Sequence, residues 1–369
     1  MKKVLILGIA PVQMDAIIEL KKMGVKTYAC AQANDGPGSI YADHFQLINF
    51  TEVDRVIEFI QEHEIDCVYS VGSDIAIPIS AAISEKMGLP HFVSSRTAKI
   101  CNNKIKMREF LGNDFDGNIK FQLINNINDK IELSYPFIMK PSDSQGQRGV
   151  RLIKDYNEFQ QHFEACKRFS REETVIIEEY IEGPELSVNA YMIDGDIAFF
   201  VPSDRVVWPQ FQGGLIRKHV VPSKVLNSST NERVKDLVCR VAKKLGIVNG
   251  PLYFQIKMKD DQPFIIEVTP RLDGCHMWNV LRYYTGVNLI KLTFEHLLFG
   301  NTDELYNCKK FEGQYTLEFL CDAPNKQADY TNFNIPSNTL FSFKYYNDGD
   351  LIRAINGQFE KIGYYIIQD

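Results

Sequence analysis

Gln255, Glu267 and Arg271 are the residues whose types and spacing point most directly to chemistry. Gln255 and Glu267 lie on two predicted strands that a turn at Asp260 joins. Oxygen ligands on neighbouring strands, with few protein ligands in total, suit Mg²⁺, which completes its shell with phosphate oxygens and water. Arg271, just beyond the second strand, is suited to neutralise charge on a transferring phosphoryl group. The sequence therefore predicts a magnesium and phosphate site here.

Two lysines earlier in the chain are candidates for binding phosphate. Lys140 ends the apolar predicted strand 136–139, and Lys104 opens a predicted helix over 106–111. Burying an unpaired ammonium group costs several kcal/mol, so a lysine at the end of a buried strand needs an anionic partner. A side chain that snorkels to the surface is the alternative, and the sequence leaves it open.

A loop of small polar residues follows Lys140. It runs from Ser142 to Gly149 and contains Gly146. Such a loop presents backbone N–H groups to phosphate, and its glycines allow close approach. An ordinary connection between two strands explains the same residues equally well, because the loop has only two glycines.

The carboxylate-rich segment 177–185 has the character of a nucleotide-binding strand. We expect the backbone groups of Glu179 and Ile181, just after Glu178, to read the edge of an adenine, and Glu185 to bind the ribose hydroxyls. The alternative is an acidic strand at the edge of a sheet, exposed to solvent.

The first hundred residues alternate between predicted strands and helices, which is typical of a parallel sheet covered by helices. The strands are expected over 4–8, 27–31, 45–48 and 67–71, and the helices over 14–23, 53–63 and 74–87. The glycines of a dinucleotide-binding fingerprint are missing after Gly8, and Pro11 lacks an N–H for phosphate. These features disfavour a nicotinamide dehydrogenase.

From about residue 97 the pattern changes to antiparallel hairpins and amphipathic helices, so the predicted fold class is α/β followed by α+β. The last seventy residues, rich in aromatic and β-branched residues, are expected to form a small β-rich extension. The expected domains are 1–100, 101–302 and 303–369.

The composition excludes several classes of protein. The 369 residues are 45% hydrophobic and 24% charged, which is typical of globular proteins. The 41 Lys and Arg residues against 47 Asp and Glu give a net charge of −6, whereas a nucleic-acid binder normally has a basic excess. No apolar run reaches ~18 residues, so we expect no membrane span. The eight cysteines show no CxxC or zinc-motif spacing, and a cytoplasmic location is expected.

The order and spacing of these motifs resemble the ATP-grasp superfamily, and most closely its carbamoyl-phosphate-synthetase-like and biotin-carboxylase-like ligases. The motifs are a lysine, a second lysine with a small-residue loop, Glu-(x)6-Glu, and Gln-(x)11-Glu-x-Thr-Pro-Arg. The resemblance implies a doubly wound pre-ATP-grasp domain over 1–100, a two-lobed ATP-grasp fold over 101–302, and ATP and Mg²⁺ as cofactors.

The resemblance also implies roles for single residues. Lys104 and Lys140 are similar to the lysines that bind the α- and β-phosphates, and 142–149 to the mobile loop that covers them. Glu178 to Ile181 resemble the adenine edge, with Glu185 on the ribose.

In the same family pattern, Gln255 and Glu267 are similar to Mg²⁺ ligands, and Arg271 to the arginine that steadies the acyl-phosphate step. Thr269 stands where many relatives have Asn. Its shorter hydroxyl is a candidate Mg²⁺ ligand, and the sequence leaves open whether it supports a second Mg²⁺.

Three further residues are candidates for contacting substrate. Arg205 and Arg217 flank a loop that lines the acceptor pocket in relatives, and they are candidates for binding a carboxylate; surface arginines are the alternative. His276 is either a substrate contact or simply the residue that starts a helix.

The function that the resemblance implies is an ADP-forming carboxylate–amine ligase. Its partners would be a small carboxylic acid, for which an amino acid is one candidate, and an amine. A carboxylase that phosphorylates bicarbonate and a nucleotide-binding regulatory module without catalysis are the alternatives. The sequence leaves open which substrates are used and whether the chain forms a homo-oligomer.

Overall fold

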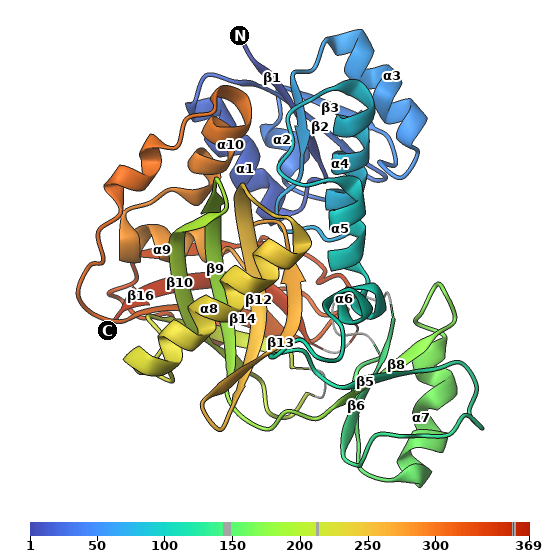
Figure 1. Ribbon diagram of the computed structural model, residues 1–369. Coiled ribbons are helices and arrows are strands. Elements are labelled where there is room, and N and C mark those ends of the chain that lie inside the picture. Colours follow the sequence, from blue (N-terminus) through green and yellow to red (C-terminus); the bar gives the residue numbers. More distant parts are fainter. Residues whose placement is uncertain (143–148, 212–213, 356, 358) are drawn as a thin grey trace.

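The computed structural model describes residues 1–142, 149–211, 214–355, 357 and 359–369. Within these ranges the chain folds into three sheets with helices packed on them (Figure 1). No described helix is both long enough and apolar enough to cross a membrane.

The first sheet is parallel, as the alternation of strands and helices predicts. Its strands lie in the order β3 (His44–Leu47), β2 (Lys26–Ala31), β1 (Lys3–Leu7) and β4 (Cys67–Tyr69). The helices of this part are α1 (Pro11–Lys22), α2 (Gly38–Tyr41), α3 (Val53–His63) and α4 (Ala76–Met87). The apolar residues of β1 are fully buried, because helices cover both faces of such a sheet.

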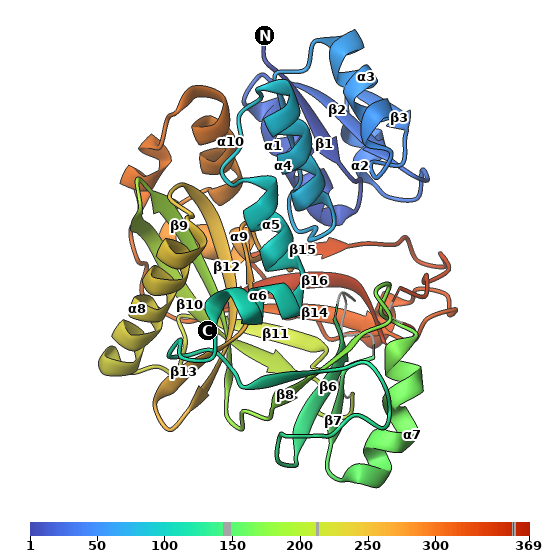
Figure 2. The same ribbon diagram turned by 45° about the vertical axis from the view of Figure 1, so that its right-hand side comes forward.

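Two short helices connect the parallel sheet to the rest of the chain. They are α5 (Ser95–Asn102) and α6 (Lys104–Leu111), and in both views they lie between the parallel sheet and a small antiparallel sheet (Figure 1, Figure 2). Each begins at a side-chain cap, since Ser94 accepts a hydrogen bond from the Thr97 N–H and Asn103 from the Lys106 N–H. Asn103 thereby sets where α6, the helix that carries Lys104, begins.

The small sheet is antiparallel and packs against one helix. Its strands lie in the order β5 (Phe121–Ile124), β8 (Val175–Glu179), β6 (Phe137–Pro141) and β7 (Arg151–Ile153), and its helix is α7 (Tyr156–Lys167). Phe137 packs with Phe159 and Phe163 of α7 in a separate core. This core fixes β6 and β8 side by side, and with them the ends that carry Lys140 and Glu178.

The largest sheet has eight strands. Their order is β13 (Gln262–Thr269), β12 (Gly250–Lys259), β9 (Glu185–Ile193), β10 (Asp196–Val207), β11 (Ile216–Val221), β14 (Tyr315–Asp322), β16 (Glu360–Gln368) and β15 (Phe341–Lys344). The C-terminal strands therefore continue this sheet through the pairing of β14 with β11, instead of forming a sheet of their own (Figure 2).

Three helices and two 3₁₀ turns complete the described part of the chain. They are α8 (Ser228–Leu245), α9 (Met277–Thr285), α10 (Leu289–Phe299), η1 (Asp303–Asn307) and η2 (Tyr330–Asn332). The apolar stripe of α8, which includes Val234 and Val241, is fully buried, as its helical spacing predicts.

Candidate active site

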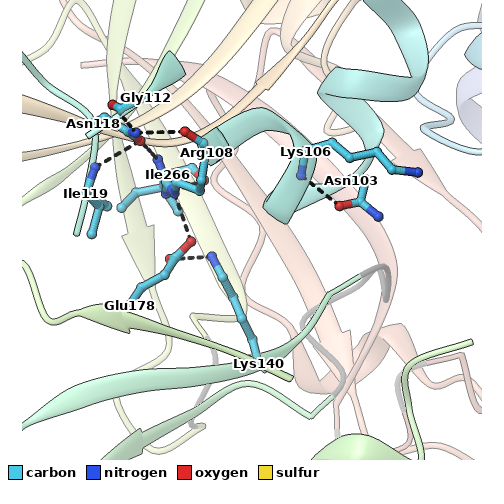
Figure 3. Close-up of polar contacts among 9 residues, drawn as sticks. All are labelled: Asn103, Lys106, Arg108, Gly112, Asn118, Ile119, Lys140, Glu178 and Ile266. Atoms are coloured by element: carbon cyan, nitrogen blue, oxygen red, sulfur yellow. Dashed lines mark hydrogen bonds and ion pairs between the residues drawn. The ribbon is translucent and has the colours of Figure 1, made fainter. Parts of the chain in front are cut away.

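Lys140, Glu178 and Arg108 form a buried charged triad at the junction of α6 with the small sheet. Lys140 Nζ lies 2.5 Å from Glu178 Oε2, and Arg108 Nε donates to Glu178 Oε1 over 2.9 Å. Figure 3 shows the carboxylate between the two cations. Glu178 is thus the anionic partner that a buried lysine at a strand end requires.

Arg108 is a residue that sequence reasoning missed. Its side chain is fully buried and also donates to Asn118 Oδ1 over 3.0 Å and to the Ile266 carbonyl over 3.2 Å (Figure 3). It therefore joins α6, the small sheet and β13, which are far apart in sequence. Its position in a helix that also carries Lys104 and Lys106 gave no signal for this role.

The pKa values of Glu178 and Lys140 are shifted both by burial and by the charges of their partners. Burial by itself raises the pKa of the Glu178 carboxyl, but the charges of Arg108 and Lys140 together lower it well below its ordinary value. Burial lowers the pKa of the Lys140 ammonium, with Glu178 opposing that shift. The Glu178 carboxylate therefore stays ionised, and its ion pair with Lys140 holds the lysine side chain in place.

The candidate phosphate loop is described only at its two ends. Ser142 is buried, its hydroxyl lies 3.0 Å from that of Ser170, and it accepts a hydrogen bond from Thr174. Gly149 has φ +74°, and a Cβ there would lie 2.9 Å from Pro141. Gly146 and the rest of 143–148 lie outside the described residues.

Lys104 lies next to the start of that loop. Its backbone N–H donates to the Ser142 carbonyl over 3.3 Å, and its charge contributes to lowering the pKa of Lys140, after burial and Arg108. The structure thus brings the two candidate phosphate lysines to one place.

The segment after Glu178 leads from the small sheet to the large one. β8 lies between β5 and β6, so the alternative of an edge strand is wrong. Glu179 is partly exposed, with its carboxylate 3.7 Å from Lys259 Nζ, and Ile181 is buried. Glu185 accepts a 2.5 Å hydrogen bond from Gln255 Nε2 and forms an ion pair with Arg205. The Glu185 carboxylate, expected on ribose, is thus already bound by protein groups.

Gln255, Glu267 and Thr269 share one face of the β12–β13 hairpin. Gln255 lies directly opposite Glu267 in the register, and Thr269 opposite Tyr253. The Gln255 amide nitrogen bonds Glu185, which leaves its carbonyl oxygen as the ligand atom. The Thr269 hydroxyl is buried and has no hydrogen-bond partner within the described ranges. These hard oxygen donors fit Mg²⁺.

Arg271 lies just after this hairpin, and its side chain bonds Asp74 in the loop between β4 and α4. Its Nε donates to Asp74 Oδ1 over 2.7 Å, and its Nη1 to the Leu272 carbonyl over 2.9 Å. Burial by itself lowers the pKa of the guanidinium, but the carboxylates around it, Asp74 first, raise it above its ordinary value. Arg271 is therefore a buried, permanent cation. Asp74 is a second residue that sequence reasoning missed, since only the tertiary fold places it here.

The three candidate substrate residues lie in different surroundings. Arg205 is buried and paired with Glu185, so the surface alternative is wrong for it. Arg217 is half-exposed, donates to Glu318 over 2.9 Å and lies over the Trp208 ring. His276 is the residue before α9, as the helix-start alternative expects, and its Nδ1 lies 2.8 Å from Asp15 Oδ2.

Comparison with known proteins identifies the part of the chain that contains this site. Residues 133–278 match the family model of the ATP-grasp domain. They form an ATP-grasp domain. Lys140, Glu178, Glu267 and Arg271 all lie inside it, whereas Lys104 and Arg108 precede it.

Two curated relatives align with the chain over longer stretches than the family model does. A formate-dependent phosphoribosylglycinamide formyltransferase of Prochlorococcus marinus is 24% identical over 282 residues, which cover 73% of this chain and 70% of that protein. An alanine–anticapsin ligase of Bacillus subtilis is 23% identical over 298 residues, or 73% of this chain and 62% of that protein.

A solved structure shows that the fold extends beyond the ATP-grasp domain. The L-amino acid ligase from Bacillus licheniformis superposes with a TM-score of 0.83 at 20% identity, covering all of this chain and 93% of that one. The likeness at this identity concerns the fold, and it includes both the parallel sheet and the C-terminal strands.

Proposed function

We propose that the protein is an ATP-dependent, ADP-forming ligase that joins a small carboxylic acid to an amine through an acyl phosphate. The observation that carries this proposal is the pairing, within an ATP-grasp domain, of hard oxygen donors on β12 and β13 with the buried cation of Arg271. Two of the relatives are named as ligases of amino acids, which supports amide formation.

The chain's own residues bind and orient ATP in this proposal. Lys140, held by Glu178, and Lys104 bind its phosphates, and the backbone of Glu179 and Ile181 contacts the adenine. Gln255, Glu267 and Thr269 would hold Mg²⁺, which when bound neutralises phosphate charge.

The reaction then needs positioning and charge, not a protein nucleophile. A carboxylate oxygen of the acid attacks the γ-phosphorus, and the bond to the β–γ bridging oxygen breaks, releasing ADP. The amine nitrogen next attacks the acyl carbon, and inorganic phosphate leaves. Arg271 stabilises the negative charge that develops during transfer, because Asp74 fixes its guanidinium at the site.

Hydroxylamine trapping tests the proposal. The protein is incubated with Mg-ATP, pools of small carboxylic acids including amino acids, and excess hydroxylamine. The expected result is a hydroxamate together with ADP, because hydroxylamine attacks an acyl phosphate. ADP release with bicarbonate and no hydroxamate would indicate a carboxylase. Tight ATP binding without ADP release from any acid would favour the regulatory module.

Matched arginine variants separate the site from general effects. Arg271→Ala should lower kcat by ~10²–10³ while ATP still binds, since its charge acts mainly in the transition state. Arg240→Ala, which removes an arginine paired with Asp236 on α8, should leave turnover unchanged. Equal rates in the two variants would contradict the role of Arg271.

A further inference from the structure

His219, Asp273 and Cys275 form a buried cluster beside the candidate active site. His219 lies on β11, and the other two residues lie in the loop between Arg271 and α9. One ligand atom of each residue lies within 4.8 Å of the other two, and all three side chains are buried. The proposed reaction uses none of them.

The His219 imidazole has no partner for either nitrogen among the described residues. It is fully buried, and a neutral imidazole carries one donor and one acceptor, both of which cost free energy when buried unpaired. Burial first, then Arg205 and Lys361, lowers the pKa of His219 well below its ordinary value. The ring is therefore neutral, which is the form that binds a metal ion.

Asp273 also has one buried carboxylate oxygen without a partner among the described residues. Its Oδ1 accepts a 3.2 Å hydrogen bond from the Cys275 N–H, whereas its buried Oδ2 has no partner in the described part of the chain. The hydrogen bond fixes the carboxylate relative to the Cys275 thiol. Two of the three side chains thus end in buried atoms that lack a partner.

We propose that His219, Asp273 and Cys275 bind a divalent transition-metal ion, of which Zn²⁺ fits best. A nitrogen, an oxygen and a sulfur ligand suit a borderline-soft cation, unlike the all-oxygen donors for Mg²⁺ on the β12–β13 hairpin. Three protein ligands leave one position of a tetrahedral shell for water or another small ligand.

Three cations, Arg271, Lys361 and Arg205, act on the Asp273 carboxylate, and Arg271 is itself paired with Asp74. Arg205 is paired with Glu185, which offsets part of its positive charge. Lys361 donates to Cys275 Sγ over 3.4 Å and lies over the Phe319 ring, so it is placed to bond the thiolate once metal binds. Binding replaces the thiol proton by the metal, and the released proton goes to solvent. Asp273 and the thiolate then supply two negative charges for a divalent cation.

Co²⁺ titration of the full chain tests this site without any turnover. The exposed Cys239 and Cys308 are first replaced by Ser, and excess Mg²⁺ occupies the oxygen site. We expect about one equivalent of Co²⁺, with a thiolate-to-cobalt charge-transfer band and the visible absorption of tetrahedral Co²⁺. Zn²⁺ should displace the Co²⁺ and remove both signals.

Variants show whether these residues are the ligands. Cys275→Ser should abolish the charge-transfer band, and His219→Gln should weaken Co²⁺ binding at least tenfold. Cys166→Ser removes another buried thiol, in the core of the small sheet, and should change neither signal. No band in the parent protein, or a band that persists in folded Cys275→Ser, would overturn the proposal. These outcomes do not depend on ATP hydrolysis, so they are distinct from a failure of the proposed ligase function.

Discussion

Replacing Arg108 by Met should destabilise the protein by about 3 kcal/mol, because it breaks the buried triad while keeping most of the side-chain volume. Removing one partner of a buried ion pair typically costs ~3–5 kcal/mol. We expect the lower end, since Lys140 remains 2.5 Å from Glu178 and still compensates the carboxylate. The loss of the hydrogen bonds to Asn118 and the Ile266 carbonyl acts in the same direction.

The same variant should change how stability depends on pH. The folded-state pKa of Glu178 is lowered from 4.5 to about 2, so its stabilising contribution is complete above pH 4.5 and is lost as the pH falls toward 2. Arg108 supplies much of that shift. Arg108→Met should therefore lose less stability than the wild type between these two pH values.

Urea denaturation at several pH values, followed by circular dichroism, measures both effects. Arg55→Ala, which removes an exposed pair with Glu52 at the start of α3, serves as the control and should change stability by no more than about 0.5 kcal/mol. If Arg108→Met is as stable as this control, and has the wild-type pH dependence, the triad does not stabilise the fold as described.

Three further predictions concern the site itself. Lys140→Ala should weaken Mg-ATP binding by ~1.5–3 kcal/mol in calorimetry, the usual contribution of hydrogen bonds to charged groups, and unchanged affinity in a folded variant would contradict phosphate binding by this lysine. Glu267→Gln should lower kcat by ~10²–10³ and raise the Mg²⁺ concentration needed for half-maximal rate, whereas an unchanged Mg²⁺ dependence would exclude Glu267 as a ligand. Asp74→Asn should lower kcat by up to ~10²-fold with ATP affinity unchanged, since Arg271 loses the carboxylate that positions it. A wild-type kcat in steady-state assays of that variant would show that Asp74 is not needed for positioning.

Local patterns predicted the elements that carry the site. The strand-ending Lys140 and the alternation of β12 and β13 follow from apolar spacing, and the structure places these elements where their patterns predict. The charge requirement of a buried lysine also predicted an anionic partner, which is Glu178. These inferences succeed because strand period and charge burial are local or pairwise constraints.

Contacts between distant segments could not be predicted in this way. Asp74 bonds Arg271 across 197 residues, and Arg108 reaches Ile266 across 158. The ligand atoms of Cys275 and His219 come within 4.8 Å of each other only in the tertiary fold, so the absence of a zinc-motif spacing did not reveal their cluster. Contacts of this kind depend on how the sheets pack against one another. No periodic pattern in a single sequence predicts that packing.

The central claim, an acyl-phosphate intermediate, is tested most directly by following oxygen from the acid. A substrate carboxylate labelled with ¹⁸O is incubated with the protein, Mg-ATP and an amine, and the products are separated and analysed by mass spectrometry. We expect one ¹⁸O atom in inorganic phosphate and unlabelled ADP, because the carboxylate oxygen that attacks the γ-phosphorus leaves with the phosphoryl group. Label in AMP, with release of pyrophosphate, would mean an acyl-adenylate and would contradict the roles assigned to Lys140, Glu267 and Arg271.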